Sequence, residues 1–171
     1  MSAVRSSADR APLRMVPMTQ RSLDAVLMIE QSAYAFPWST GNFVDSLGAS
    51  HVCQLLCDAH GTVLGYFVAL PGYEEMHLLN ITVAPAEQGK GLGLRLLETL
   101  VRLCRPWAAH ELWLEVRPSN QRAMRIYERF GFEAKGVRKG YYPAALGTRE
   151  DAIVMGLKIA AAAQGDGDAL E

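Results

Sequence analysis

The sequence predicts an α/β fold in which helices lie on both faces of a mixed central sheet. Two observations support this prediction. Three strand-like apolar segments follow one another in the middle of the chain, and after them helical and strand-like segments alternate. The length of 171 residues, half of them hydrophobic and a fifth charged, is typical of one globular domain with a substantial core.

The folded domain is expected to span residues 13–159. Residues 1–12 are polar and rich in Ser, Ala and Arg, and residues 160–171 carry few bulky apolar side chains. Chain ends of that composition are usually poorly ordered. We therefore expect a flexible tail at each end of a single domain.

The first half of the domain contains the signals of two helices and a hairpin. Thr19 is a suitable N-cap for a helix whose apolar stripe is interrupted by Glu30, and Pro37 ends that helix because proline lacks a backbone N–H. Asp58–Gly61 has the composition of a turn between strands. The predicted elements are a strand at Leu13–Met18, a helix from Thr19 to Tyr34, a short helix from Ser39 or Thr40 through Leu47, and strands at Val52–Cys57, Val63–Leu70 and Met76–Val83.

The second half is predicted to alternate helix and strand. Leu92, Leu96 and Leu100 share one side of a strongly amphipathic segment, and Gly131 can close a later helix in the left-handed conformation. The predicted elements are a helix that opens at residues 88–93, a strand at Leu112–Val116, a helix at Ser119–Phe130 and a final strand at Ala152–Ile159.

The charge and hydropathy patterns argue against nucleic-acid and membrane partners. Lys and Arg together number 17 and Asp and Glu 18, so no positive surplus is available to hold nucleic acid. The most apolar stretch, Val63–Leu70, is less than half a membrane span, and the N-terminus lacks the apolar core of a signal peptide. A cytoplasmic protein is expected.

Cysteine and histidine give no metal-site pattern. The cysteine count of three is odd, which agrees with a reducing compartment, and Cys53, Cys57 and Cys104 lie in apolar segments where core packing is expected. No histidine pair has the spacing of a zinc site. The histidines, among them His77, lie near element ends, where solvated positions are expected, so no metal is predicted.

Residues 88–93, Gln-Gly-Lys-Gly-Leu-Gly, follow a predicted strand and open a helix. Glycine allows positive φ, and the first N–H groups of a helix have no internal partner and favour an anion. The glycine spacing matches neither the Walker pattern nor the dinucleotide pattern. The turn therefore predicts a site for the diphosphate of a coenzyme, with a plain structural turn as the alternative.

Gln88, Gly91 and Gly93 fill the three defined positions of Q/R-x-x-G-x-G/A, and in this the chain resembles the GCN5-related N-acetyltransferase family. The resemblance implies the acyl-CoA N-acyltransferase fold, with a mostly antiparallel sheet, and acetyl-CoA as co-substrate. It also implies that the preceding strand binds the pantetheine arm through its backbone. The implied donor-binding residues are Ile81, Thr82 and Val83 for the pantetheine arm, and Gly89, Lys90, Gly91, Leu92, Gly93 and Leu94, with Gln88, for the diphosphate.

Further segments resemble one bacterial subgroup of that family, which acetylates the N-terminal alanine of a small-subunit ribosomal protein. The similarity runs from about Leu13 to Ile159 and implies the N-terminal peptide of that protein as partner. The segments that carry it are residues 36–39, 112–117, Asn120, 127–132, 141–143 and 149–152.

Glu115 is the candidate general base. An ammonium has no lone pair, so the acceptor amine must lose a proton before it attacks a thioester. Glu115 lies within an otherwise apolar strand, where burial disfavours its ionised form. A structural ion pair with Arg117 or another arginine is an equal alternative from the residues alone; the subgroup resemblance implies the base.

Tyr127 is the candidate general acid. Asn120 and Tyr127 are seven residues apart and share one helix face, so Asn120 could bond the pantetheine arm while the phenol lies near the sulfur. Periodicity alone favours core packing of Tyr127 with Ala123 and Phe130, and Asn120 could be only a helix cap. The family resemblance implies the acid role of Tyr127.

Phe36, Trp38, Tyr141 and Tyr142 could line the acceptor groove, although packing explains Phe36 and Trp38 equally well. The cysteines lack the setting of an activated thiolate, so direct transfer in a ternary complex is expected. Acetylation of a small amine and a non-catalytic acetyl-CoA-binding module stay open as alternatives.

Overall fold

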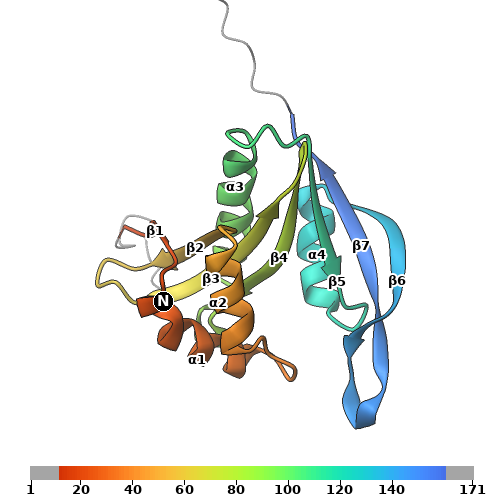
Figure 1. Ribbon diagram of the computed structural model, residues 1–171, viewed down its shortest axis with the longest axis horizontal. Helices are drawn as coiled ribbons and strands as arrows, with labels where there is room; N and C mark the ends of the chain where they lie inside the picture. The colour runs from red at the N-terminus through yellow and green to blue at the C-terminus, as the bar shows by residue number, and fades with distance from the viewer. Residues whose placement is uncertain (1–11, 161–171) are drawn as a thin grey trace, which may run out of the picture. The chain divides into compact units, whose positions relative to one another are not determined.

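A computed structural model describes residues 12–160 (Figure 1). The predicted flexible tails lie outside these residues, apart from Pro12 and Ala160. The elements in chain order are β1 Arg14–Pro17, η1 Gln20–Ser22, α1 Leu23–Ala33, α2 Thr40–Gly48, β2 Val52–Cys57, β3 Val63–Pro71, β4 Glu75–Val83, η2 Pro85–Glu87, α3 Leu92–Cys104, β5 Glu111–Val116, α4 Gln121–Phe130, β6 Glu133–Pro143, η3 Ala145–Gly147 and β7 Arg149–Lys158.

Within the described residues the strands form one seven-stranded sheet in the order β1-β2-β3-β4-β5-β7-β6. The pairs β1/β2, β5/β7 and β6/β7 are antiparallel, whereas β4 and β5 run parallel. A parallel pair needs a long crossover, and α3 supplies it between β4 and β5. The predicted mixed, mostly antiparallel α/β fold is confirmed.

Local sequence signals account for several element boundaries. Ser39 caps α2, since its Oγ accepts the N–H of Asn42 at 3.2 Å. In the β2–β3 turn, Asp58 Oδ1 accepts the N–H groups of His60 and Thr62, each at 2.9 Å, and Gly61 has a φ of 82°. The predicted second helix and hairpin are both present.

Strand β6 is the strand that the sequence does not predict. It lies at one edge of the sheet, and all of its residues are exposed or half-exposed. It therefore lacks the alternation of buried and exposed side chains from which a strand is recognised. Its partner β7 begins at Arg149, three residues before the predicted start at Ala152.

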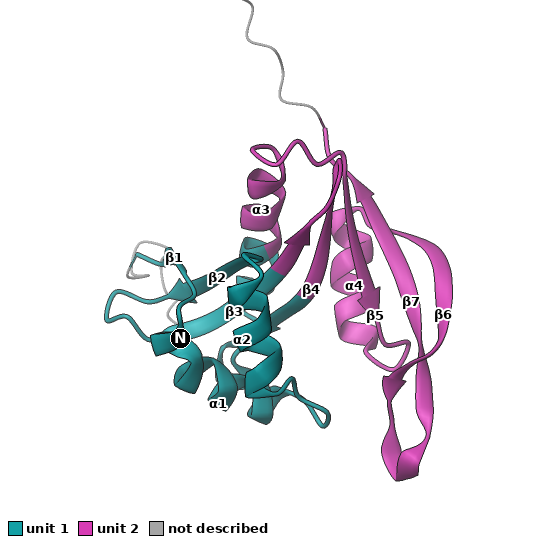
Figure 2. Cartoon of the chain, in the orientation of Figure 1, with its two compact units in different colours: residues 1–68, 80–96 teal, residues 69–79, 97–171 magenta. Residues whose placement is uncertain are grey.

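The chain divides into two compact units (Figure 2). Unit 1 comprises residues 1–68 and 80–96, and unit 2 comprises residues 69–79 and 97–171. Fully buried side chains in unit 1 include Phe43, Leu56, Tyr66, Phe67 and Leu96, and those in unit 2 include Met76, Leu97, Leu100, Leu112, Leu114 and Met155.

The predicted core packing of the cysteines is confirmed. Cys53, Cys57 and Cys104 are buried and free. Burial raises the pKa of the Cys53 and Cys104 thiols to about 11, which disfavours the reactive thiolate.

Candidate active site

The glycine turn lies in unit 1 between β4 and the start of α3. Gly89 and Gly91 have φ values of 79° and 81°, a conformation that strains residues with a Cβ atom. The N–H of Arg95 donates to the Gly91 carbonyl at 3.2 Å and so opens the α3 ladder. The N–H groups just before it have no acceptor within the helix, and the helix dipole favours an anion beside them.

Two side chains brace this turn. Gln88 Nε2 donates to the Val83 carbonyl at 3.2 Å, which ties the turn to the end of β4. Lys90 Nζ lies 2.8 Å from Glu87 Oε2 in an exposed ion pair. A Cβ built on Gly91 would meet no heavy atom within 4 Å, so there is open space beside the turn. The backbone amides are thus better suited than these side chains to hold a ligand.

The end of β4, in unit 1, contains the candidate pantetheine-binding residues. Asn80 and Thr82 are buried, while Ile81 and Val83 between and after them are half-buried. Thr82 Oγ1 donates to Asn80 Oδ1 at 2.8 Å and lies 2.7 Å from the Tyr34 hydroxyl. The Thr82 side chain therefore makes its hydrogen bonds inside unit 1, and the backbone of Thr82 is the part suited to contact a ligand.

Glu115 is nearly buried in unit 2, near the end of β5. Its side chain is 6% exposed, and its two oxygens have different partners. Oε2 lies 2.5 Å from Nε2 of His77 on β4, and Oε1 lies 3.1 Å from Nε of Arg138 on β6. Glu115 thus combines the two properties that the sequence left open, a buried carboxylate and an ion pair with an arginine. That arginine is Arg138, because Arg117 pairs with Glu150 at 3.2 Å.

Asn120 and Tyr127 lie at the start and in the last turns of α4, in unit 2. The predicted cap is present, since Asn120 Oδ1 accepts the N–H of Ala123 at 3.2 Å. The Tyr127 ring packs edge-on against Phe132 with 5.6 Å between centroids, and Tyr127 is 9% exposed. Gly131 closes the helix at a φ of 116°, as predicted. The packing alternative for the Tyr127 ring is therefore present, and it fixes the ring without assigning a role to the hydroxyl.

Tyr141 and Tyr142, near the end of β6 in unit 2, form an edge-to-face pair with centroids 4.9 Å apart. The Arg117 guanidinium lies 4.4 Å from the Tyr142 centroid, and that of Arg138 lies 5.7 Å from the Tyr141 centroid. Burial raises the pKa of both phenols, and the charge of Glu115 raises it further. Unit 2 thus gathers Glu115 and both tyrosines in one region.

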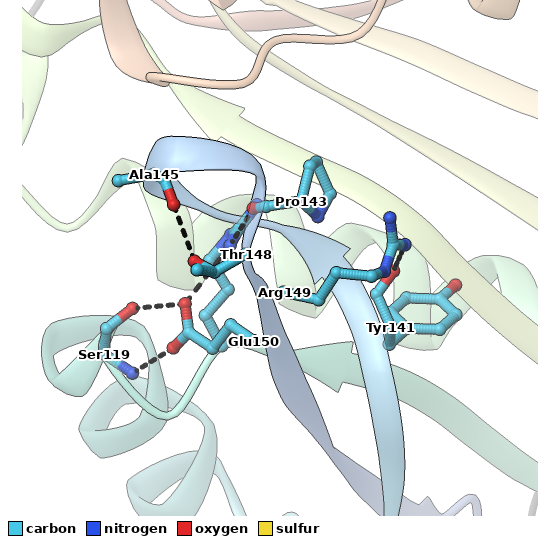
Figure 3. A network of polar contacts seen from close by, with 8 residues as sticks. Ser119, Tyr141, Pro143, Ala145, Thr148, Arg149 and Glu150 are labelled. Atoms are coloured by element: carbon cyan, nitrogen blue, oxygen red, sulfur yellow. Dashed lines mark hydrogen bonds and ion pairs between the residues drawn. The ribbon is translucent and has the colours of Figure 1, made fainter.

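A polar network holds the end of the β6–β7 hairpin against the loop before α4 (Figure 3). Glu150 accepts hydrogen bonds from the backbone N–H and the hydroxyl of Ser119, at 2.9 and 3.0 Å. Arg117 donates to Glu150 and, at 2.9 Å, to the carbonyl of Pro143. The network fixes the strand end next to Tyr142.

The aromatic residues Phe36 and Trp38 lie in unit 1, in the loop between α1 and α2. Phe36 is exposed, whereas the ring of Trp38 packs 5.2 Å from that of Phe43. The backbone N–H of Trp38 donates to Glu30 Oε1 at 2.9 Å. Packing therefore explains Trp38, and Phe36 is the more exposed of the two.

A family model described as the acetyltransferase (GNAT) family matches residues 23–132, more than half of the chain. The chain belongs to this acetyltransferase family. Enzymes of the GNAT family take the acetyl group from acetyl-CoA.

Relatives of this GNAT chain align with most of it. The protein named [Ribosomal protein bS18]-alanine N-acetyltransferase of Escherichia coli K12 is 40% identical over 137 residues, which cover 80% of this chain and 91% of that protein. Its namesake from Salmonella typhimurium is 39% identical over 142 residues, covering 83% and 95%. The crystal structure of the ribosomal-protein-S18-alanine N-acetyltransferase from Escherichia coli matches with a TM-score of 0.80 and 36% identity, over 90% of this chain and 98% of that one.

Three residues of this GNAT chain acquire contacts that the sequence did not indicate. His77, expected to be solvated, contacts Glu115, and Arg138 lies in the strand that was not predicted. Glu30, which interrupts the apolar stripe of α1, is buried and accepts a hydrogen bond from the backbone N–H of Trp38. A carboxylate on an apolar face was the available signal for Glu30.

No group of three or more His, Cys, Asp or Glu side chains among residues 12–160 could hold a metal ion. No helix in the same range is long and apolar enough to cross a membrane.

Proposed function

We propose that this GNAT chain transfers the acetyl group of acetyl-CoA to the N-terminal alanine amine of a small-subunit ribosomal protein. The acceptor is proposed from the relatives, which are named for that reaction and align over nearly their whole length. A ribosomal protein is made in the cytoplasm, so the proposed reaction takes place there. No direct contact with nucleic acid is part of the proposal.

The observation that carries the catalytic part is the buried Glu115 carboxylate, held at 2.5 Å from an imidazole nitrogen. A base inside an apolar strand is shielded from water, and its hydrogen-bond partners fix its direction. Tyr141 and Tyr142 lie in the same region of unit 2 as Glu115, and their rings offer two aromatic surfaces to a peptide. These features suit deprotonation of an amine at the end of a peptide chain.

The donor is proposed to bind through backbone groups of unit 1. The amides from Gly89 to Leu94 would hold the diphosphate of acetyl-CoA, because the positive φ of Gly89 and Gly91 and the start of α3 direct N–H groups outward. The backbone of Ile81, Thr82 and Val83 would bond the pantetheine arm. Gln88 and Lys90 would support the turn through the contacts they already make, and Asn120 would add a bond to the pantetheine arm.

In the proposed reaction Glu115 removes a proton from the alanine ammonium, and the free amine attacks the thioester carbonyl. A C–N bond forms and the C–S bond breaks, and Tyr127 gives its proton to the departing thiolate. The nitrogen loses its second proton to water as the amide forms, and water returns a proton to the Tyr127 phenolate. The transfer is direct, because burial raises the pKa of Cys53 and Cys104 and so disfavours an acetyl-cysteine intermediate. Phe36 and Trp38 would contact the peptide together with Tyr141 and Tyr142.

The test is a transfer assay with purified full-length protein, acetyl-CoA and a peptide copied from the N-terminus of bS18. We expect release of coenzyme A and a mass increase of one acetyl group on the alanine. The same peptide with its N-terminus already acetylated should give neither signal. Glu115→Gln and Tyr127→Phe should each lower kcat by about a hundredfold, the lower range for general acid–base catalysis.

Other outcomes would separate the alternatives. Release of coenzyme A only with polyamines or free amino acids would replace the ribosomal acceptor by a small amine. Tight acetyl-CoA binding without transfer to any amine would indicate a non-catalytic binding module. Full turnover by the Tyr127→Phe variant would remove Tyr127 from the acid role.

A further inference from the structure

The backbone of unit 2 places His77 beside Glu115. Strands β4 and β5 run parallel, and His77 stands in register with Trp113. Residues two apart on one strand share a face of the sheet, so Glu115 lies on the same face as Trp113 and diagonally next to His77. Sheet register therefore accounts for the proximity of imidazole and carboxylate.

The contact between His77 and Glu115 is short and joins a nearly buried carboxylate to a more exposed imidazole. His77 Nε2 and Glu115 Oε2 are 2.5 Å apart, shorter than the roughly 2.7–2.9 Å that is usual for an N–H···O hydrogen bond between charged groups. The Glu115 side chain is 6% exposed, whereas that of His77 is 27% exposed. The imidazole thus lies between the carboxylate and water.

Other groups near the pair limit which side chain can accept a proton from Glu115. The Glu115 oxygens contact His77 and Arg138, and a guanidinium has no acceptor. Opposite Glu115 on β7 lies the apolar Val154. The charged and titratable groups that share this face or approach it from β4, β5 and β6 include Glu75, Glu111, Lys135, Arg138, Tyr141 and Tyr142.

Both tyrosines hold their protons more tightly than usual, since burial and the Glu115 charge raise their pKa. Histidine is the side chain that ordinarily gains and loses a proton near neutral pH. Among the two groups bonded to Glu115, the imidazole is therefore the one suited to proton exchange.

We propose that His77 carries the proton of Glu115 to solvent, so that the two side chains act as one proton-transfer unit. The proton that Glu115 takes from the acceptor amine passes from Oε2 to Nε2 of a neutral imidazole whose own proton is on Nδ1, which leaves a carboxylate paired with an imidazolium. Water then accepts the proton from Nε2 while Nδ1 keeps its own, so that the accepting form of the imidazole and the free base are both restored. This step rests on the proposed function, because it assigns the base role to Glu115.

The first test does not depend on acetyl transfer. A short imidazole–carboxylate hydrogen bond gives a proton resonance far downfield of the amide region. We expect this resonance in the full-length protein and its loss in both His77→Gln and Glu115→Gln. His60→Gln, in the exposed β2–β3 turn, is the matched control and should retain it.

The second test is kinetic and uses variants whose melting temperature stays within a few degrees of the wild type. His77→Gln can still donate a hydrogen bond to Glu115 but cannot carry a proton, so we expect kcat to fall about tenfold with KM for acetyl-CoA within about twofold. Added imidazole should restore part of the rate of His77→Ala. The dependence of kcat on pH should change in His77→Gln and stay that of the wild type in His60→Gln.

The two proposals fail in different ways. Absence of the downfield resonance, or a His77→Gln enzyme with unchanged kcat and pH profile, would overturn the proton-transfer unit. A tenfold slower His77→Ala that imidazole does not rescue would also overturn it, since a structural role alone would then explain the loss. If the resonance is present but no amine is acetylated, the proposed function fails while the hydrogen-bonded pair stands.

Discussion

The backbone N–H of Trp38 donates a hydrogen bond of 2.9 Å to Oε1 of Glu30, a carboxylate that is 1% exposed. Oε2 of the same residue accepts the hydroxyl of Tyr66, and Asn80 Nδ2 lies 3.2 Å from it. Glu30 therefore links α1, the α1–α2 loop, β3 and β4 inside unit 1. Burial is the main cause of the raised pKa of Tyr66, and the negative charge of Glu30 raises this pKa further.

Removal of this carboxylate should destabilise the protein. Glu30→Ala leaves the Tyr66 hydroxyl and the Trp38 N–H without their acceptor, and we expect a loss of roughly 2–4 kcal/mol in the free energy of unfolding. Urea denaturation followed by tryptophan fluorescence measures it. Glu98→Ala, an exposed carboxylate on α3, is the control and should change stability by less than about 0.5 kcal/mol. Equal effects of the two substitutions would contradict the linking role of Glu30.

Gly65 on β3 is needed for close packing. A Cβ at this position would lie 2.7 Å from the Thr82 carbonyl oxygen and 3.2 Å from Leu96 Cδ1. Because the first of these is a backbone atom of the adjoining strand, Gly65→Ala should destabilise the protein by about 1–3 kcal/mol. In Gly48→Ala, on α2, the new Cβ meets nothing within 4 Å, so this control should leave the melting temperature unchanged or raise it. A Gly65→Ala melting temperature equal to that of the control would show that the strands shift freely.

Local sequence signals predicted the helices and strands that bury one face, because burial of one face gives an element a periodic apolar pattern. Helix α3 and the hairpin β2–β3 combine a clear apolar pattern with capping or turn residues. Strand β6 has neither, because an exposed edge strand has no buried face to leave a pattern. The sequence consequently missed Arg138, whose place beside Glu115 depends on that strand.

Partners of a candidate residue were harder to predict than the residue itself. Glu115 stood out as a carboxylate in an apolar strand, but its contact with His77 follows from the register of β4 with β5. Register joins residues 38 positions apart in sequence, and no local pattern encodes it. For the same reason the Arg117 partner is Glu150, not Glu115.

The Ser119–Glu150 contact predicts an acid-sensitive part of the stability. Hydrogen bonds from the Ser119 hydroxyl and N–H, with Arg117 nearby, lower the pKa of Glu150 below its ordinary value of 4.5. A carboxyl whose folded-state pKa is depressed stabilises the fold above its ordinary pKa, and this contribution is lost as the pH falls through the depressed value. The melting-temperature difference between wild type and Glu150→Gln should therefore be full at neutral pH and shrink below pH 4.5.

Ser119→Ala provides the companion measurement. It removes the hydroxyl donor and keeps the N–H donor, so its pH dependence should lie between those of the wild type and Glu150→Gln. A Glu150→Gln difference that stays constant across the acid range would mean that the Glu150 charge contributes nothing to stability.

The glycine turn can be tested with two glycines in the same strained conformation. Gly91 has a φ of 81° and Gly61 a φ of 82°, and an added Cβ meets no heavy atom within 4 Å at either position. Alanine at either position should therefore cost a similar amount of stability, on the order of 1 kcal/mol, from backbone strain alone.

The two substitutions should differ in their effect on acetyl-CoA. Gly91 belongs to the turn whose amides are proposed to hold the diphosphate, so a rotated backbone or an added methyl group displaces those donors. We expect the Kd for acetyl-CoA, measured by titration calorimetry, to rise about tenfold in Gly91→Ala, equivalent to about 1.4 kcal/mol of lost binding energy. Gly61→Ala, in the β2–β3 turn, should bind acetyl-CoA like the wild type. Equal Kd values in both variants would remove the turn from the donor site, because strain of the same size would then be present without any loss of binding.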